Sequence, residues 1–264
     1  MGGSLRIEVA GETNVGMKRT HNEDNFSIME ESGLYIVADG MGGHASGEVA
    51  SKMAVDAMRE FFAATANDPE RTWPYKMDRS KGYEENRLIT GIKLANLRIF
   101  ESAQRDTRQR GMGTTVVALF AVEDGVYVAH VGDSRVYRMR DGTLEQLTED
   151  HSLLNDYIKM KRLTPEEIAN FPHKNVIVRA LGMKDTVQVD ISRLEPQAND
   201  LYILCSDGLS GMIHEPELFE KVSAFMNDPS KQNDIEGMCH ELINTANKNG
   251  GTDNVTVVAI KVVP

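Results

Sequence analysis

Four aspartates lie next to short apolar runs that predict β-strands. Three come just after such a run and one comes just before: Asp39, Asp133 and Asp207 after, Asp253 before. Antiparallel neighbours place the end of one strand beside the start of the next, so all four side chains can meet at one edge of a sheet. Converging carboxylates repel one another unless a cation lies between them, and oxygen ligands favour Mg²⁺ or Mn²⁺. The alternative is that Asp-Gly and Gly-Asp-Ser are ordinary turn sequences.

A possible phosphate-binding group precedes the first of these acids. In the segment Arg19-Thr-His-Asn-Glu-Asp24, an extended backbone would put Arg19, His21 and Glu23 on one face and Asp24 on the other. An arginine beside a metal-facing Glu23 can bind two phosphoryl oxygens at once, which a lysine cannot. A surface salt bridge is the alternative interpretation of the same residues.

The expected elements form layers. Helical periodicity, with apolar residues at i, i+3, i+4 and i+7, extends over Gly47–Ala63, Glu84–Ala103 and Asp234–Asn247. β-rich runs occupy Leu34–Ala38, Thr114–Ala121, Gly125–Val131, Arg135–Arg140, Thr143–Leu147, Leu201–Cys205 and Val255–Val262. Tight turns join the runs between residues 114 and 147 and predict an antiparallel meander. Helices before, between and after a mostly antiparallel sheet indicate an α/β layered sandwich, not an alternating βαβ fold.

Length and composition narrow the class of protein. The chain has 264 residues, 41% of them hydrophobic, and a net charge of −11. We expect one domain over residues 1–264, since no repeat or linker divides it, and no nucleic-acid partner, since that needs a basic face. Cys205 and Cys239 predict no disulfide framework. Without a signal peptide or an apolar run of about 18 residues, we expect a cytoplasmic monomer with no membrane contact.

Eight short motifs carry a resemblance to a known family. They are Arg19-x-x-Asn-Glu-Asp24, Val37-Ala-Asp-Gly-Met-Gly-Gly-His-Ala-x-Gly-Glu-x-Ala-Ser51, Gly111-Met-Gly-Thr-Thr115, His130-Val-Gly-Asp-Ser-Arg135, Leu147-Thr-x-Asp-His-Ser152, Arg179-Ala-Leu-Gly182, Cys205-Ser-Asp-Gly-Leu209 and Gly251-Thr-Asp-Asn-Val-Thr256. In type and order they resemble the type-2C metal-dependent protein phosphatases. The sequences Asn-Glu-Asp and Met-Gly-Gly-His resemble those of the bacterial branch of that family.

The resemblance implies a fold and a metal centre. The fold is two mostly antiparallel β-sheets flanked on both outer faces by helices. The centre holds two Mg²⁺ or Mn²⁺ ions, and bacterial relatives often hold a third. The resemblance implies a role for each matching residue. Asp39 bridges two ions, and the Gly40 carbonyl is a further ligand; Asp207 and Asp253 complete the coordination of one ion, and Glu23 lies near the other. Asp133 and Asp207 hold the third ion. The residue matching Arg19 binds the substrate phosphate.

The resemblance also implies a reaction. A water shared by two cations attacks the phosphorus of a phosphoserine or phosphothreonine on a protein, without a covalent intermediate. Some family members have a His directly after the Asp-Gly pair as general acid, but Met41 stands there, so His44 and a metal-bound water are the candidates. Residues 151–175 correspond to a variable flap, which we expect to contact the phosphoprotein. A cognate Ser/Thr kinase is a further partner expected of a bacterial member.

Other classes fit the sequence less well. Gly40-Met-Gly-Gly-His-Ala45 matches a dinucleotide-binding pattern, but the helix after it leads to Asn-Asp-Pro and a second helix instead of a parallel strand. A cysteine phosphatase needs Cys-x₅-Arg, and Gly211 and Thr245 stand where the arginine would be. A catalytically inactive binding module with the same fold is the remaining alternative, although such a protein is expected to lose metal acids.

Overall fold

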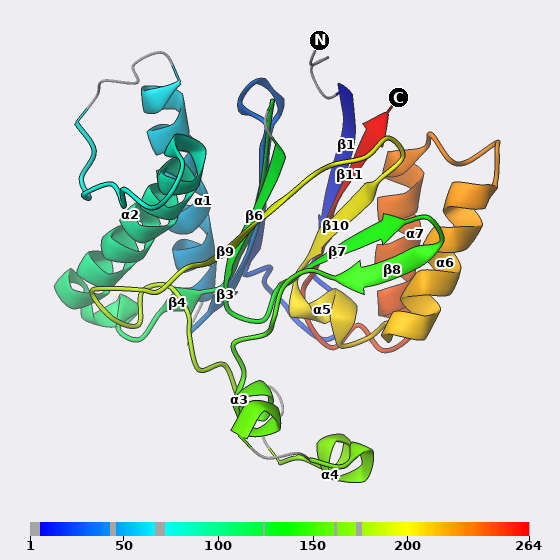
Figure 1. Ribbon diagram of the computed structural model, residues 1–264. Coiled ribbons are helices and arrows are strands. Elements are labelled where there is room, and N and C mark those ends of the chain that lie inside the picture. Colours follow the sequence, from blue (N-terminus) through cyan, green and yellow to red (C-terminus); the bar gives the residue numbers. More distant parts are fainter. Residues whose placement is uncertain are drawn as a thin grey trace.

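Two antiparallel sheets are stacked face to face, and helices cover the outer face of each (Figure 1). The computed structural model describes residues 6–42, 46–66, 72–123, 125–160, 163–172 and 176–263. The order helix, sheet, sheet, helix confirms the predicted α/β layered sandwich. Every strand pairing among the described residues is antiparallel, which excludes the parallel sheet of a dinucleotide-binding fold.

One sheet has five strands and the other has six. In spatial order the five-stranded sheet contains β1 (Arg6–Asn14), β11 (Val255–Val263), β10 (Leu201–Cys205), β7 (Arg135–Arg140) and β8 (Thr143–Gln146). The six-stranded sheet contains β2 (Asp24–Met29), β3 (Leu34–Met41), β5 (Val116–Val122), β6 (Gly125–Val131) and β9 (Asp190–Leu194), and β4 (Gly113–Thr114) pairs with the end of β3.

The central strands are buried on both faces, which explains their continuous apolar sequences. Along β3, Leu34 and Ile36 pack in the layer beneath the helices, whereas Tyr35 and Val37 pack between the two sheets. A strand buried in this way has no room for a charge in its middle. Acids are therefore restricted to its ends, and Asp39 lies at such an end.

Helices α1 (Ser46–Thr65) and α2 (Tyr83–Arg105) cover the six-stranded sheet, and α6 (Glu215–Asn227) and α7 (Ile235–Lys248) cover the five-stranded one (Figure 1). The bounds of α1, α2 and α7 agree with the prediction to within two residues. Helix α6 is absent from the prediction, although its buried Leu218, Val222 and Phe225 have helical spacing. Short 3₁₀ turns occupy Glu30–Ser32 and Thr107–Gln109.

The predicted meander is wrong at one turn. Strand β5 pairs with β6 and β7 with β8, but β6 and β7 belong to different sheets. The turn Gly132-Asp133-Ser134, here called the crossing turn, therefore carries the chain from one sheet to the other. Gly132 has a φ of 111°, and a Cβ on it would lie 2.7 Å from Cβ of Thr115. The sharp crossing is possible because Gly132 has no side chain.

Three strands that the sequence does not reveal lie at sheet edges. Strands β1, β2 and β9 each have a single neighbour, and most of their residues are only partly buried. Partial burial weakens the alternation of apolar and polar residues, which is the pattern that predicts a strand.

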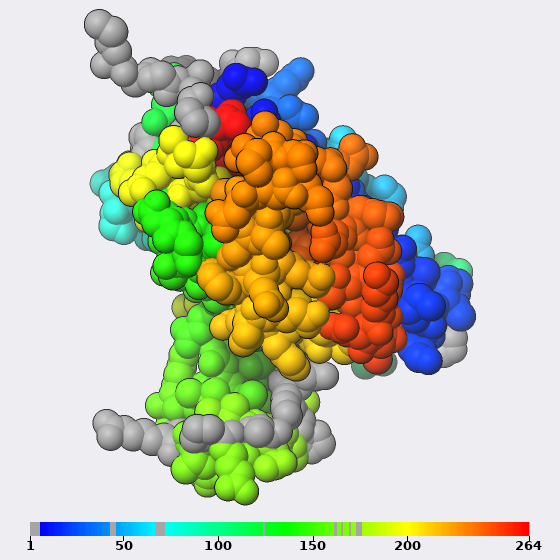
Figure 2. All heavy atoms as spheres, turned by 90° about the vertical axis from the view of Figure 1, so that its right-hand side faces the viewer, coloured from blue at the N-terminus to red at the C-terminus, as the bar shows by residue number. Residues whose placement is uncertain are grey.

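The segment 151–175 projects from the sandwich at the end where β4 and α5 (Asp207–Ser210) lie (Figure 1). Its described part contains α3 (Leu153–Met160) and α4 (Pro165–Ala169), and Figure 2 shows the same projection from another side. Residues 161–162 and 173–175 of this segment lie outside the described residues.

We expect Gly132→Ala to destabilise the fold more than Gly142→Ala. Both glycines have positive φ, but a Cβ on Gly142 meets nothing within 4 Å. Its cost is backbone strain alone, about 1–2 kcal/mol. At Gly132 the contact with Thr115 adds about 1–3 kcal/mol. Urea unfolding of both variants measures the difference, and equal free energies of unfolding would show that the crossing turn is not crowded.

Candidate metal and phosphate site

The four aspartates predicted to converge lie at the same end of the two sheets. Asp39 is near the end of β3, Asp133 is in the crossing turn, Asp207 begins α5, and Asp253 stands two residues before β11. The charges of the other three act on Asp39, together with that of a fifth acid, Asp24. The structure therefore brings the four predicted acids together and adds one.

Burial is the main cause of raised pKa values in this group, followed by neighbouring charges. Burial and then nearby acids hold the pKa of Asp39 well above its usual range and raise the pKa of Asp207. The same causes raise the pKa of Asp133 to about 7. The carboxyl groups of Asp207 and Asp39 also lie close together. Two carboxylates can make such a contact only with a proton or a cation between them.

Two oxygen atoms show where positive charge is missing. Oδ1 of Asp24 and Oδ1 of Asp133 are buried, and neither has a hydrogen-bond partner among the described residues. An unpaired buried carboxylate oxygen is costly. An oxygen-only set of donors is the kind that Mg²⁺ and Mn²⁺ prefer. The residues present therefore fit the predicted cations.

The backbone of Asp39 is held from two sides. Its N–H donates to Thr115 Oγ1 at 3.0 Å, and its carbonyl accepts from Thr114 Oγ1 and from the Thr115 N–H, both at 2.8 Å. Thr115 Oγ1 also shares a hydrogen bond of 2.7 Å with Ser134 Oγ, in the crossing turn. The end of β3 and the crossing turn are thus joined through one threonine.

Asp24 lies among the other aspartates, and the prediction that it points away from the site is wrong. Residues 19–23 are not part of a strand, and β2 begins only at Asp24, so the assumed alternation of faces does not apply. Asp24 stands opposite Asp39 across β2 and β3, and its Oδ2 accepts from Ser206 Oγ at 2.7 Å and Thr256 Oγ1 at 2.6 Å. Burial raises its pKa to about 7. The sequence offered one signal for this contact. Ser206 stands next to Asp207 and Thr256 stands close to Asp253, and hydroxyl groups at these places can donate to a further carboxylate.

Arg19 contacts the acids from the solvent side. Its Nη2 donates to Asp253 Oδ2 at 2.7 Å, and 50% of its side chain is exposed. Burial lowers the pKa of the guanidinium, but the charges of Asp253, Glu23 and Asp207 raise it by more. Glu23 is anchored nearby, since its backbone N–H donates to Asn254 Oδ1 at 2.8 Å. The partner of Arg19 in this salt bridge, Asp253, is thus one of the predicted metal ligands.

Glycines let the start of α1 approach the end of β3. A Cβ on Gly40 would lie 2.1 Å from the carbonyl oxygen of Gly47, so the two backbones are in contact. The Gly40 N–H donates to Glu23 O at 3.1 Å, which fixes the Asp-Gly pair beside Glu23. Met41 follows as the last residue of β3. His44, one of the two candidates for the general acid, lies outside the described residues.

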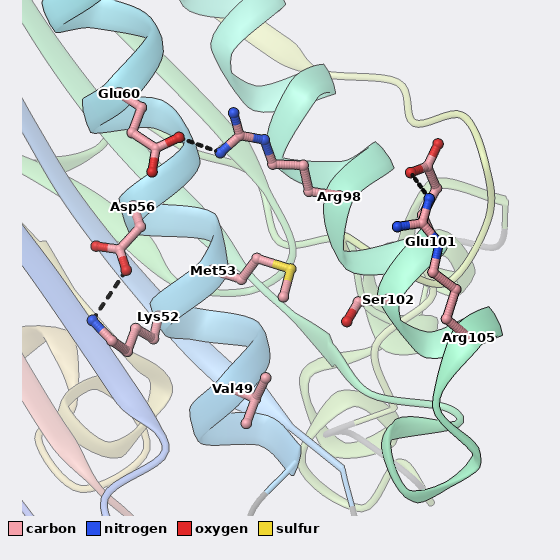
Figure 3. A pocket seen from close by; sticks show the side chains of 9 residues that line it. All are labelled: Val49, Lys52, Met53, Asp56, Glu60, Arg98, Glu101, Ser102 and Arg105. Atoms are coloured by element: carbon pink, nitrogen blue, oxygen red, sulfur yellow. Dashed lines mark hydrogen bonds and ion pairs between the residues drawn. The ribbon is translucent and has the colours of Figure 1, made fainter.

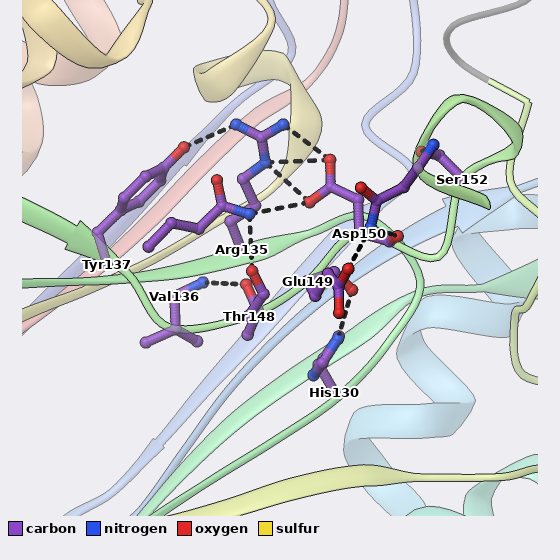
Figure 4. Close-up of polar contacts among 10 residues, drawn as sticks. His130, Arg135, Val136, Tyr137, Thr148, Glu149, Asp150 and Ser152 are labelled. Carbon is purple, nitrogen blue, oxygen red and sulfur yellow. Dashed lines mark hydrogen bonds and ion pairs between the residues drawn. The ribbon is translucent and has the colours of Figure 1, made fainter. Parts of the chain in front are cut away.

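An arginine fastens the crossing turn to the root of the projecting segment (Figure 4). Arg135, two residues after Asp133, donates from Nε at 2.9 Å and from Nη2 at 2.7 Å to the carboxylate of Asp150. Its Nη1 donates to Tyr137 Oη at 2.8 Å. A pair with two hydrogen bonds fixes orientation as well as distance. The position of Asp133 is therefore linked to residues at the start of the projecting segment.

Three other side chains, His130, His151 and Asp190, offer metal-ligand atoms within 4.8 Å of one another. A positive group already occupies this place, because Arg179 Nη1 donates to Asp190 Oδ1 at 2.6 Å and lies 3.0 Å from His151 Nε2. His130 Nε2 is hydrogen-bonded to the carbonyl of Glu149 at 2.8 Å. Each of the three side chains has a protein partner, and we assign no metal to them.

A groove between α1 and α2 is separate from the acids (Figure 3). It has a volume of about 530 Å³, and Val49 and Met53 form its apolar part. The charged residues that line it pair among themselves: Lys52 with Asp56, Arg98 with Glu60, and Arg105 with Glu101. None of these is a predicted site residue, and the paired charges give the groove no evident ligand.

Comparisons with known proteins identify the class that this fold and site define. The sequence model of a family described as "Protein phosphatase 2C" matches residues 16–245. The serine/threonine phosphatase stp of Listeria welshimeri is 38% identical over 256 residues, which are 94% of this chain and 93% of that protein. The Mycobacterium tuberculosis serine/threonine phosphatase PstP/Ppp has a similar solved structure, with a TM-score of 0.82, 32% identity, and coverage of 98% of this chain and 99% of that chain. A structure of the PstP catalytic domain in complex with two manganese ions has a TM-score of 0.77 at 30% identity, and covers 99% of this chain and 100% of that chain.

The chain belongs to the protein phosphatase 2C family. It is therefore an enzyme that removes phosphate from proteins, and the bacterial resemblance of its motifs is confirmed. These relatives are phosphatases, so an inactive binding module is not supported. Among the helices of the described residues, none has both the length and the apolar character that a membrane crossing requires.

Thr256→Val removes one hydroxyl donor from the buried Asp24 carboxylate and keeps the shape of the side chain. We expect the free energy of unfolding in EDTA to fall by about 1–3 kcal/mol. Thr143→Val, at an exposed position of β8, is the matched control and should change it by less than about 0.5 kcal/mol. Urea denaturation compares the two. If both variants are as stable as the wild type, the hydroxyl of Thr256 does not support Asp24.

Proposed function

We propose that the chain hydrolyses phosphoserine and phosphothreonine on proteins, with water as nucleophile, at a centre of two or three Mg²⁺ or Mn²⁺ ions, the third of which would lie at Asp133. The observation that carries this proposal is the group formed by Asp24, Asp39, Asp133, Asp207 and Asp253. Asp24 and Asp133 are buried, and each has one unpaired oxygen. The mutual repulsion of the group calls for cations. Similarity to the PstP catalytic domain, which is in complex with two manganese ions, supports the choice of metal.

Asp39 suits the bridging role best. The other aspartates of the group all act on it, and its backbone is fixed on both sides by Thr114 and Thr115. The carbonyl of Gly40, next along β3, would serve one of the two bridged ions. The remaining ligands follow the family pattern: Asp207 and Asp253 for one ion, Glu23 for the other, and Asp133 with Asp207 for the third.

Arg19 would hold the substrate. When bound, divalent cations lower the pKa of a water and neutralise charge on phosphoryl oxygens. The guanidinium of Arg19 stands half exposed beside Asp253, where two of its N–H groups can bind two phosphoryl oxygens and orient the ester towards the acids. As water adds to phosphorus, the bond to the serine or threonine oxygen breaks and that oxygen takes a proton. His44 is our candidate for the proton donor.

Residues 151–175 are our candidate for contacts with the phosphoprotein. The segment projects at the same end of the molecule as α5, which begins with Asp207 (Figure 1). It exposes Tyr157, Ile158 and Met160, and apolar side chains grouped on a projecting surface suit a protein partner. A cognate Ser/Thr kinase would supply the phosphoproteins that this enzyme consumes.

Asp39→Asn should lower kcat for a phosphothreonine peptide in Mn²⁺ by at least about 10²-fold, because it removes charge from the centre of the site. The wild type in excess EDTA should fall to a similar level. Asp56→Asn is the matched control, since Asp56 is paired with Lys52 on the exposed face of α1. Its kcat should stay within about twofold of wild type. Full activity of Asp39→Asn, or of the wild type in EDTA, contradicts a metal-dependent reaction.

Arg19→Lys should raise KM for the same peptide about tenfold and change kcat less, because a lysine cannot bind two phosphoryl oxygens in a fixed plane. Arg105→Lys, in an exposed pair with Glu101 on α2, is the control and should leave both constants unchanged. Steady-state kinetics measure them. An unchanged KM in Arg19→Lys would remove Arg19 from phosphate binding.

A further inference from the structure

His151 joins three parts of the chain at the root of the projecting segment. Its backbone N–H donates to Gly132 O at 2.9 Å, and its ring Nδ1 accepts the Gly132 N–H at 3.0 Å. Gly132 directly precedes Asp133 in the crossing turn. On the other side of the ring, Nε2 lies 3.2 Å from Asp190 Oδ2 and 3.0 Å from Arg179 Nη1. One side chain therefore connects the crossing turn to residues that follow the projecting segment.

These contacts fix the tautomer of His151. A backbone N–H can only donate, so Nδ1 is an unprotonated acceptor and the ring proton is on Nε2, where Asp190 accepts it. Burial and then the neighbouring His130 lower the pKa of His151 to about 4, which keeps the ring neutral near pH 7. The ring is also stacked on that of His130, with centroids 4.6 Å apart. It is therefore held in one orientation, with one nitrogen for Gly132 and the other for Asp190.

The outer end of this connection lies on the chain that returns from the projecting segment. Arg179 Nη1 donates to Asp190 Oδ1 at 2.6 Å, and these side chains are 31% and 40% exposed. The Val178 N–H donates to His151 O at 2.9 Å, so the two arms of the segment meet at His151. Carboxylates orient imidazoles in the same way around metal centres. Here the oriented imidazole holds a peptide group.

We propose that His151 is a positioning residue for the carboxylate of Asp133. Its two hydrogen bonds hold the N–H and the carbonyl of Gly132. Asp190 accepts from the ring, and Arg179 holds Asp190 in place. Together with the pair of Arg135 and Asp150, they hold the crossing turn so that the unpaired Oδ1 of Asp133 stays beside the other aspartates of the group. The inference rests on the proposed function, because it gives His151 the task of setting the affinity of the third ion.

The test is to measure Mn²⁺ binding to the intact chain by isothermal titration calorimetry. The binding step that is lost in Asp133→Ala is the step that depends on Asp133. His151→Gln places its amide near the position of Nε2 and removes the acceptor for Gly132. His151→Asn places an oxygen where Nδ1 stood. We expect that step to weaken about tenfold in His151→Gln and to return to within about threefold of wild type in His151→Asn. The other binding steps stay unchanged in both variants.

Two further variants separate this role from general damage to the fold. Asp190→Asn changes a half-exposed residue and loosens the ring from outside, and it should weaken the same step about threefold. His240→Gln is the matched control, since His240 makes an exposed contact with Glu12 on the five-stranded sheet. It should leave all Mn²⁺ binding and the melting temperature unchanged.

The possible outcomes are distinct. Equal weakening in His151→Gln and His151→Asn would overturn the inference, because ring packing alone would explain it. Unchanged Mn²⁺ affinity in His151→Gln, or as many ions bound in Asp133→Ala as in wild type, would overturn it while the wild type still hydrolyses phosphopeptide. A wild type that neither binds Mn²⁺ nor hydrolyses phosphopeptide would overturn the proposed function and this inference with it.

Discussion

Repulsion among partly dehydrated carboxylates is the constraint on which the rest of this structure depends. Two unit charges about 4 Å apart interact by about 4 kcal/mol at the effective dielectric constant of a protein surface. A few such pairs equal the whole free energy of unfolding of an ordinary domain, about 5–15 kcal/mol. The hydroxyls of Ser206 and Thr256 and the guanidinium of Arg19 offset part of this repulsion. Burial and the repulsion that remains explain why the carboxyl groups with raised pKa values lie together at one end of the molecule.

The two sheets share this group of acids. Asp24 and Asp39 belong to the six-stranded sheet, Asp207 and Asp253 border strands of the five-stranded sheet, and Asp133 lies in the turn between the sheets. The apolar layer between the sheets therefore sets how far apart the acids stand. Tyr35 and Val37 from one side and Tyr202 and Leu204 from the other fill that layer, and each is buried. Side chains without any polar function thus determine the geometry of the polar site.

Sequence reasoning reached the site because buried strands exclude charge from their middles, so acids beside apolar runs had to lie at strand ends. It placed α1, α2 and α7 within two residues because their apolar stripes are unbroken. It failed for Asp24, since the side that a residue faces follows from sequence only if the backbone is extended, and residues 19–23 are not a strand. Sequence reasoning also did not predict that the chain changes sheet at Gly132, because a short turn has the same sequence features whether it closes a hairpin or crosses between sheets.

The individual hydrogen bonds between distant residues were beyond sequence reasoning. The motifs containing His151 and Arg179 carried part of the family resemblance, but nothing in the sequences of these motifs connects them to Asp190. The link consists of hydrogen bonds between residues 11 and 39 positions apart. Similarly, no local pattern shows that the hydroxyls of Ser206 and Thr256 meet on one carboxylate 182 and 232 positions away. Such partners are determined by how the sheets stack, which is a property of the whole fold.

The position of β11 has a consequence for how this enzyme is made. Residues 255–263 form a strand between β1 and β10, so β1, formed by residues 6–14, joins its sheet only through a strand that is synthesised about 240 residues later. Asp253 lies immediately before that strand. While the chain emerges from the ribosome, β1 and β10 have no strand to join them, and the acids lack their last member. The group of acids is therefore incomplete until β11 has been synthesised and has inserted between β1 and β10.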